Sequence, residues 1–134
     1  MEENEPKKVR EVIGYKHYFR QFFQSLEPKV QAKVFKIIEA IETLQFVPSN
    51  YLKHLEGTNG LYEARIKLGS NIWRVFCFFD EGKLVVLLNG FQKKTQKTPK
   101  KEIKKALILK DEYRPHCSVS PQGRREAVRR LIRN

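Results

Sequence analysis

Cysteines and long apolar runs are scarce in this sequence. Two of its 134 residues are cysteine, Cys77 and Cys117, which rules out a disulfide framework and suits a reducing compartment. The longest apolar runs, Val75–Phe79 and Leu84–Leu88, have five residues each, whereas a membrane-spanning helix needs about 20. The first residues carry no apolar stretch behind a basic head, as a secretory signal would. We therefore expect a cytoplasmic protein without a membrane span.

Familiar catalytic motifs are missing as well. The sequence contains no glycine-rich phosphate loop and no Gly-x-Ser-x-Gly nucleophile elbow. Its three histidines, His17, His54 and His116, are too scattered along the chain to indicate a metal site. We therefore expect neither a metal ion nor a cofactor.

Acidic residues are the minority. Lysine and arginine number 27 against 15 acids, for a formal net charge of +12. Such an excess predicts a polyanionic partner, which could be nucleic acid, a ribosome-like surface or an acidic protein. A soluble domain with lysine-rich helices is the alternative that charge alone leaves open.

The positive charge is concentrated late in the chain. Residues 93–110 contain eight lysines and one acid, Glu102, and residues 114–134 contain six arginines and one acid, Glu126. The change from lysine to arginine, together with prolines and a glycine after Arg114, marks a boundary. We expect one domain over residues 1–113 and a basic tail over 114–134 that is either disordered or a short helix.

The hydrophobic pattern predicts an α+β fold. Apolar residues at three- and four-residue spacing indicate a helical hairpin that breaks at Glu27-Pro28. Alternating residues joined by short turns then predict antiparallel strands. The expected order is β-α-α-β-β-β-α, with the helical hairpin on one face of a small antiparallel sheet. The elements are a strand at 9–15, helices at 18–26 and 28–44, a loop at 47–60, strands at 61–68, 72–79 and 83–88, and a helix capped by Thr98 with Pro99 in its first turn.

Two arginines stand on the expected strands. Arg65 shares the polar face of its strand with Glu63 and Lys67, and Arg74 lies mid-strand among apolar residues. A lone buried charge is too costly, so each arginine either pairs with Glu63 or projects into a cleft. In the second case the planar guanidinium would hold phosphate oxygens bidentately.

Further candidates lie on the adjoining loops. His54 follows Lys53 before the sheet, and a neighbouring cation would keep its imidazole neutral and able to act as a base. Phe91 lies within a lysine-rich string from Asn89 to Pro99, where it either packs on the core or stacks on a base. Lys93 and Lys94 are expected to project beyond the end of the last strand.

These residues resemble a known family. The strings Tyr62–Ile66, Trp73–Phe76, Leu88–Pro99 and Glu102–Ala106 are similar to the RelE/ParE toxin superfamily. Within it, the chain resembles the HigB-like, phage-derived subgroup of bacterial type II toxin–antitoxin toxins. The resemblance covers residues 9–113, and the string ending at Pro99 is its most specific part.

The resemblance implies a ribosome-dependent endoribonuclease. Such toxins hold mRNA on the sheet while a 2′-hydroxyl of the RNA attacks the neighbouring phosphate, leaving a cyclic phosphate and a 5′-hydroxyl. Because the RNA supplies its own nucleophile, the protein needs only proton transfer and stabilisation of negative charge, which clustered cations provide without a metal. The implied partners are a cognate antitoxin of the helix-turn-helix type, the ribosome and mRNA.

Site roles follow from the same resemblance. Arg65 and Arg74 match strand arginines that grip the cleaved region, and Tyr113 matches a terminal tyrosine that stacks on RNA or moves a proton. The resemblance also places basic site residues at several other positions. Taking the resemblance and the residue pattern together, we expect the catalytic residues to be Arg65, Arg74, His54 and Lys94, and the RNA-binding residues to be Lys53, Lys67, Phe91, Lys93, Lys97 and Tyr113.

Two other functions remain open at this point. One is inhibition of DNA gyrase in the manner of ParE-like toxins, which involves protein binding and no RNA cleavage. The other is a passive RNA- or ribosome-binding module without chemistry. The basic loop and the two strand arginines favour RNA cleavage, because gyrase inhibition has no evident need for phosphate-gripping residues on the sheet.

Overall fold

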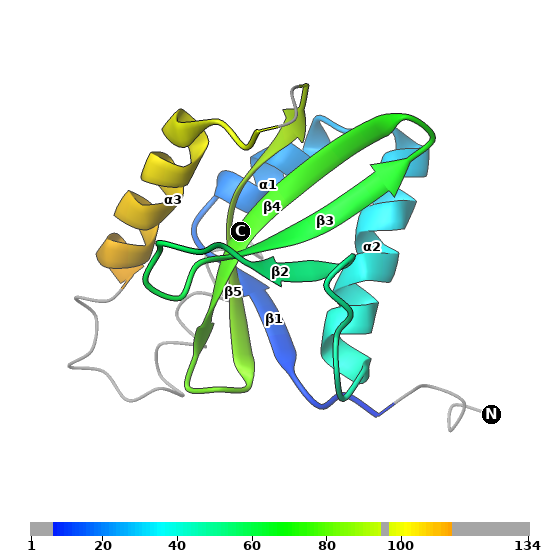
Figure 1. Ribbon diagram of the computed structural model, residues 1–134. Coiled ribbons are helices and arrows are strands. Elements are labelled where there is room, and N and C mark those ends of the chain that lie inside the picture. Colours follow the sequence, from blue (N-terminus) through cyan, green and yellow to red (C-terminus); the bar gives the residue numbers. More distant parts are fainter. Residues whose placement is uncertain (1–6, 95–96, 114–134) are drawn as a thin grey trace.

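The computed structural model describes residues 7–94 and 97–113, so the basic tail at 114–134 lies outside the described residues. Three helices and five strands are present in this part of the chain (Figure 1). They are β1 (Glu11–Gly14), α1 (Tyr18–Gln24), α2 (Pro28–Thr43), β2 (Leu52–His54), β3 (Tyr62–Leu68), β4 (Asn71–Asp80), β5 (Leu84–Lys93) and α3 (Lys100–Tyr113). None of these helices is long and apolar enough to cross a bilayer.

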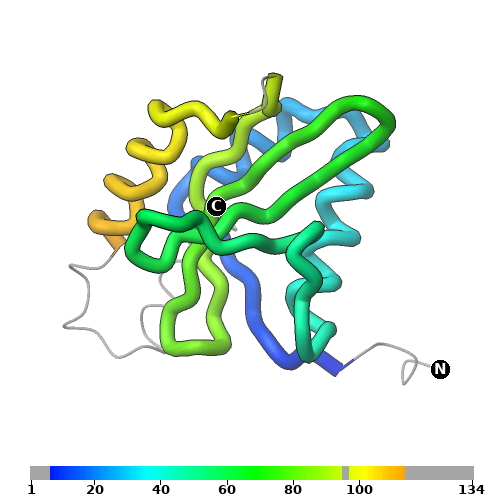
Figure 2. Tube along the Cα trace, viewed as in Figure 1, coloured from blue at the N-terminus to red at the C-terminus, as the bar shows by residue number. Residues whose placement is uncertain are grey.

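The strands form one sheet in the order β1-β5-β4-β3-β2. Successive hairpins join β3, β4 and β5, and the trace in Figure 2 follows the chain through them. Only β1 runs parallel to its neighbour, β5, within this sheet. The predicted α+β class and the order of the main elements are therefore confirmed.

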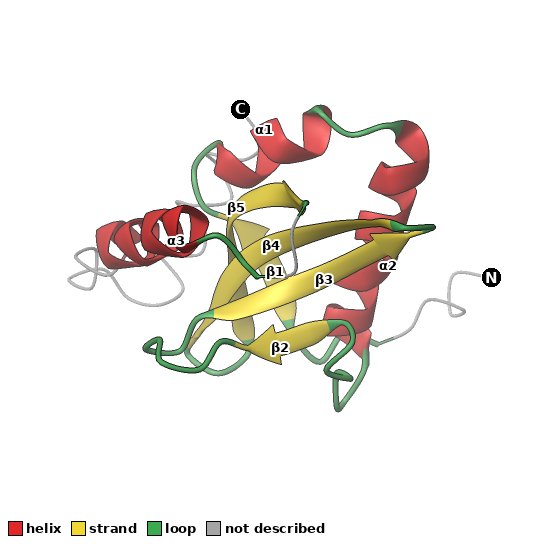
Figure 3. Cartoon of the chain, turned by 45° about the horizontal axis from the view of Figure 1, so that its top comes forward, coloured by secondary structure: helices red, strands yellow, loops and turns green. Residues whose placement is uncertain are grey.

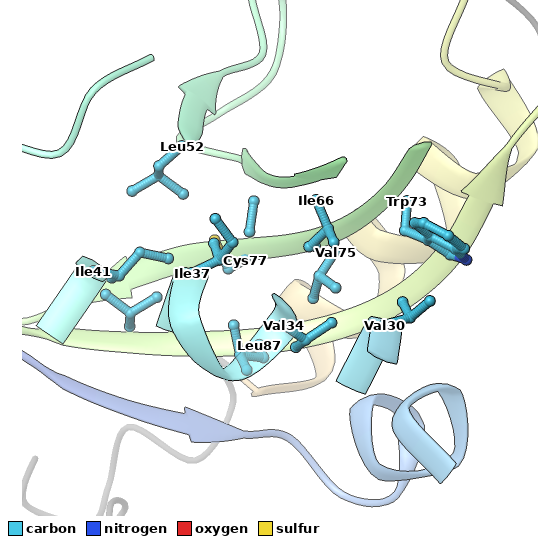
Figure 4. Close-up of a cluster of buried hydrophobic side chains, with 12 residues drawn as sticks. Val30, Val34, Ile37, Ile41, Leu52, Ile66, Trp73, Val75, Cys77 and Leu87 are labelled. Carbon is cyan, nitrogen blue, oxygen red and sulfur yellow. The ribbon is translucent and has the colours of Figure 1, made fainter. Parts of the chain in front are cut away.

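Helix α2 covers one face of the sheet. Its apolar stripe packs on side chains of β3, β4 and β5, as Figure 4 shows. The predicted stripe is correct except at Leu44, which is 40% exposed because the helix ends at Thr43. The stripe residues that are fully buried are Val30, Val34, Ile37 and Ile41.

Arg10 closes the C-terminal end of α2. Its Nη1 donates to the carbonyl oxygens of Ile41 and Leu44 at 2.9 and 2.6 Å, and its Nη2 donates to Gln45 at 2.8 Å. These carbonyls have no partner within the helix. The guanidinium therefore ties β1 to the end of α2 and also places positive charge at the negative end of the helix dipole.

Helix α3 packs on the other face of the sheet (Figure 3). Its predicted inner residues lie in or against the core cluster there, and Lys110 is buried with its ammonium 5.5 Å from the ring centroid of Phe78. Tyr113, at the helix end, donates a 2.7 Å hydrogen bond to Asp80. This face is the one that carries the polar cluster described below.

Strand β5 is longer than predicted. We expected it to end at Leu88 with a bend at Gly90, but it continues to Lys93. Val75 pairs with Gly90 while Cys77 pairs with Leu87, so two residues, Leu88 and Asn89, stand opposite Phe76. This β-bulge reverses the alternation of the strand beyond it.

The bulge decides which way the end of β5 faces. Beyond it, Phe91 packs on the α3 side and Gly90 faces α1, where a Cβ would lie 2.6 Å from the ring of Phe22. Lys93 is two residues after Phe91 and therefore lies on the α3 side as well. The segment 47–60 also differs from expectation, because Leu52–His54 form an edge strand rather than a loop.

Candidate functional site

Arg65 and Arg74 occupy directly opposite positions on β3 and β4. Side chains of such pairs project from the same face with their Cβ atoms about 5 Å apart, so two like charges here repel. Their strand neighbours Ala64 and Val75 pack under α2. By the alternation of the strands, both arginines project toward the α3 side.

One carboxylate lies between the two guanidinium groups. Glu63 Oε2 is 3.3 Å from the Nε of Arg65 and 3.3 Å from the Nε of Arg74. Glu63 is only 2% exposed. The sequence left open whether Arg65 or Arg74 pairs with Glu63, and in the structure both do.

The other oxygen of this carboxylate faces the chain that leads into α3. The hydroxyl of Thr98 donates to Glu63 Oε1 at 3.4 Å. We expected Thr98 to cap α3, but the helix begins at Lys100 and the carbonyl of Pro99 accepts from the amides of Glu102 and Ile103. Thr98 thus joins the polar cluster and connects it to the start of α3.

The two arginines differ in exposure. The side chain of Arg74 is 8% exposed, and its Nη1 donates to the carbonyl of Trp73 at 3.2 Å. The side chain of Arg65 is 28% exposed, and its Nη1 donates to Ser49 at 3.5 Å. Burial lowers the pKa of Arg74, the charge of Glu63 opposes that shift, and the charge of Arg65 adds to it. Arginine nevertheless stays protonated at neutral pH.

Two lysines flank this cluster. Lys53 pairs with Glu63 across β2 and β3 and therefore shares its face. Lys93 lies on the same face as Arg74 because of the bulge in β5. Burial lowers the pKa of Lys93, and the charges of Arg74, Arg65 and Lys53 lower it further, against the opposing effect of Glu63. We call Lys53, Glu63, Arg65, Arg74 and Lys93 the arginine cluster: four cations around one carboxylate.

His54 does not join the arginine cluster, contrary to our prediction. It pairs with Tyr62, and the two rings are 5.1 Å apart in an edge-to-face arrangement. Successive residues of a strand face opposite sides, so His54 lies on the α2 side while Lys53 lies on the α3 side. The sequence alone does not separate the two residues, because its pattern predicts a loop over 47–60.

Two aromatic residues of the predicted site are part of the core. Phe91 is half-buried with its ring centroid 5.5 Å from that of Phe76, which decides between the two alternatives in favour of core packing. Tyr113 is 1% exposed and bonded to Asp80. In this structure the ring is therefore placed in the core and not where it could stack on a base.

The remaining predicted lysines are exposed. Lys67 follows Arg65 on the same face of β3, toward the turn into β4. Lys94 comes directly after the end of β5, and Lys97 precedes α3. No set of histidine, cysteine and acidic side chains in the described part of the chain could hold a metal ion.

Sequence reasoning undervalued Glu63 and missed the bulge. The sequence predicts Glu63 only as a structural partner, although strand alternation places its side chain on the same face as that of Arg65. No feature of the string Leu88-Asn89 predicts the β-bulge. Without the bulge, Lys93 would lie on the face of the sheet that α2 covers. The arginine cluster can accept an anionic group, since its guanidinium and ammonium donors converge from three neighbouring strands and the end of a fourth, β2 to β5.

A search of curated proteins finds no match to this chain. A solved structure, the archaeal RelE–RelB complex from Pyrococcus horikoshii OT3, is similar at 23% identity over 63% of this chain and 94% of that chain, with a TM-score of 0.47. The model of a family described as "Phage derived protein Gp49-like (DUF891)" matches residues 21–111. The chain thus belongs to the phage-derived Gp49-like family.

Proposed function

We propose that this chain is the toxin of a bacterial type II toxin–antitoxin system and that it cuts mRNA on the ribosome. The observation that carries the proposal is the arginine cluster, in which Arg65 and Arg74 lie side by side with Lys53 and Lys93 next to them. Membership of the phage-derived family supports the same reading. The substrate is a single RNA strand, whose 2′-hydroxyl serves as the nucleophile.

The arginine cluster meets the electrostatic demand of this reaction. Attack of a 2′-hydroxyl on the adjacent phosphorus builds up negative charge on the phosphate oxygens. Guanidinium groups held in place before the reaction stabilise that charge, and each such donor is worth about 100- to 1,000-fold in rate. Arg65 and Arg74 are assigned to this task, and Lys53 is assigned to a neighbouring phosphate.

Proton transfer falls to a lysine in this scheme. His54 lies on the opposite face of the sheet, so it cannot reach a phosphate held by the arginines. Lys93 lies beside Arg74, and its lowered pKa brings it closer to the neutral range in which a general acid works best. We assign to Lys93 the proton that goes to the departing 5′-oxygen, to solvent water the proton that the attacking 2′-hydroxyl loses, and to Lys94 a contact with the RNA backbone.

The partner that restrains the toxin is proposed to be an acidic antitoxin. A chain of net charge +12 attracts an acidic protein at long range. Opposite charge speeds association, whereas tight binding rests on buried apolar contacts. The association rate is therefore expected to fall markedly with salt while the dissociation rate changes little. A helix-turn-helix antitoxin from the adjacent gene is the specific expectation.

Primer extension on translated messages tests the proposal. Induction of the chain should produce cuts within translated frames of cellular mRNA, and a message without a start codon should stay intact. Breaks in DNA that depend on gyrase, with intact mRNA, would support gyrase inhibition instead. Growth inhibition by neither route would leave a passive RNA-binding module, and absence of growth inhibition would contradict the toxin assignment.

A further inference from the structure

The most unusual feature of the arginine cluster is that it contains a carboxylate, Glu63. A surface that attracts RNA phosphates has a carboxylate at its centre, and Glu63 is 2% exposed. A buried charge of the wrong sign weakens the attraction for phosphate. Its presence therefore calls for a compensating role.

We propose that Glu63 is a positioning residue that holds Arg65 and Arg74 side by side, so that their outer nitrogens reach one phosphate of the RNA. This proposal rests on the proposed function, since it concerns how the same two arginines are held for contact with the RNA phosphate. Glu63 itself touches neither the RNA nor the reacting atoms.

The geometry of the two ion pairs supports this role. In both arginines the inner nitrogen, Nε, is the atom that lies near the same oxygen of Glu63. Each Nη1 contacts a backbone carbonyl. Among the described residues, neither Nη2 has a hydrogen-bond partner. The contacts thus leave donors on the outer ends of both guanidinium groups.

The attraction is one of charge more than of hydrogen bonding. The Nε atoms of Arg65 and Arg74 are buried, and neither makes a hydrogen bond of acceptable geometry within the described chain. Each Nε is nevertheless 3.3 Å from the carboxylate oxygen. A neutral amide at position 63 keeps the shape but loses the charge that offsets the repulsion between two opposed cations. Glutamine is therefore expected to be a poor substitute.

Thr98 orients the carboxylate from the other side. Its hydroxyl donates to Oε1, while Oε2 faces the two arginines. Because Thr98 contacts Oε1 and the two arginines contact Oε2, the carboxylate has little freedom to rotate. The separation of the two guanidinium groups then depends on the length of the Glu63 side chain.

Two variants of Glu63 separate the effect of its charge from the effect of its side-chain length. Glu63→Gln removes the charge and keeps the length, whereas Glu63→Asp keeps the charge and shortens the side chain by one methylene. Glu102→Gln serves as the matched control, because it removes the same charge on α3, where Glu102 Oε1 accepts from Asn89 Nδ2 at 3.1 Å. Each purified full-length variant is assayed for cleavage of mRNA by translating ribosomes and for melting temperature with and without inorganic pyrophosphate.

The expected results differ between the variants. Glu63→Gln should melt at a lower temperature, and pyrophosphate should raise its melting temperature more than that of the unchanged chain, because the anion takes the place of the lost carboxylate. Glu63→Asp should melt close to the unchanged chain but lose about 100-fold in kcat, which is the size of the loss expected for one missing oxyanion donor. The change in KM should be smaller. Glu102→Gln should match the unchanged chain in all three measurements.

Three results would overturn the proposal. One is full cleavage activity in folded Glu63→Asp, and another is faster cleavage by Glu63→Gln, which would make Glu63 a competitor of RNA. The third is an equal response of Glu63→Gln and the unchanged chain to pyrophosphate. If the unchanged chain cuts no RNA but the pyrophosphate responses differ as expected, the proposed function fails while the role of Glu63 in holding the arginines stands.

Discussion

The Nε of Arg74 lies 3.3 Å from the Oε2 of Glu63, and both side chains are almost completely buried. A buried pair of this kind is costly to break, because the remaining partner keeps its charge in a poorly solvated place. Arg65 contacts the same oxygen but is more exposed. We therefore expect the two arginines to contribute differently to stability, although the proposed function gives both the same role toward RNA.

Replacement of the two arginines should separate these contributions. We expect Arg74→Ala to lower the free energy of unfolding by about 2–3 kcal/mol, somewhat less than a fully broken buried pair, because Arg65 still faces Glu63. Arg65→Ala should cost less than about 1 kcal/mol, as for partly exposed ion pairs. Both should abolish cleavage. Urea unfolding of the purified variants measures the difference, and equal losses of stability would contradict it.

The pH dependence of cleavage should report on Lys93. A general acid must be protonated, so activity should fall as the pH rises through the lowered pKa of Lys93. Lys53→Gln removes one of the charges that lower this pKa, so the pKa rises and the alkaline limb should move to higher pH. Lys67→Gln, which removes a charge that does not contribute to the shift, is the control. An unmoved alkaline limb in Lys53→Gln would contradict the contribution of Lys53 to the lowered pKa of Lys93.

Gly90 should be sensitive to a single methyl group. A Cβ at this position would lie 2.6 Å from two ring atoms of Phe22, so Gly90→Ala should cost about 1–3 kcal/mol through overpacking. Phe22→Leu should relieve the clash, and the double variant should be more stable than the two single losses predict. Additive losses in thermal unfolding would show that α1 does not pack on β5 as described.

Tyr113 should matter for stability and not for cleavage. Its hydroxyl donates to the buried Asp80 at 2.7 Å, so Tyr113→Phe should lower the free energy of unfolding by about 1–3 kcal/mol. The cleavage rate at a temperature where the variant is folded should be unchanged. A large loss of rate in a fully folded Tyr113→Phe would restore the role in proton transfer that the resemblance implied.

Local patterns predicted most of the fold and part of the site. The two N-terminal helices and the antiparallel strands follow from periodicity and turn residues. The cost of a lone buried charge limits Arg65 and Arg74 to two alternatives, of which pairing with Glu63 is the one observed. The positions of Lys93 and His54 could not be predicted in this way. Lys93 faces the arginines only because of the bulge at Leu88 and Asn89, which is a property of the pairing of two strands. His54 faces away because a segment with the residues of a loop becomes an edge strand.

The most direct test of RNA cleavage is the chemistry of the ends it leaves. Purified chain is added to ribosomes translating one defined message, and the new 5′ ends are labelled by a kinase without prior phosphatase treatment, with Arg65→Ala as the inactive control. The account predicts fragments cut within the translated frame whose 5′ ends are hydroxyls and accept the label directly. Intact message, or fragments whose 5′ ends carry phosphate, would contradict it.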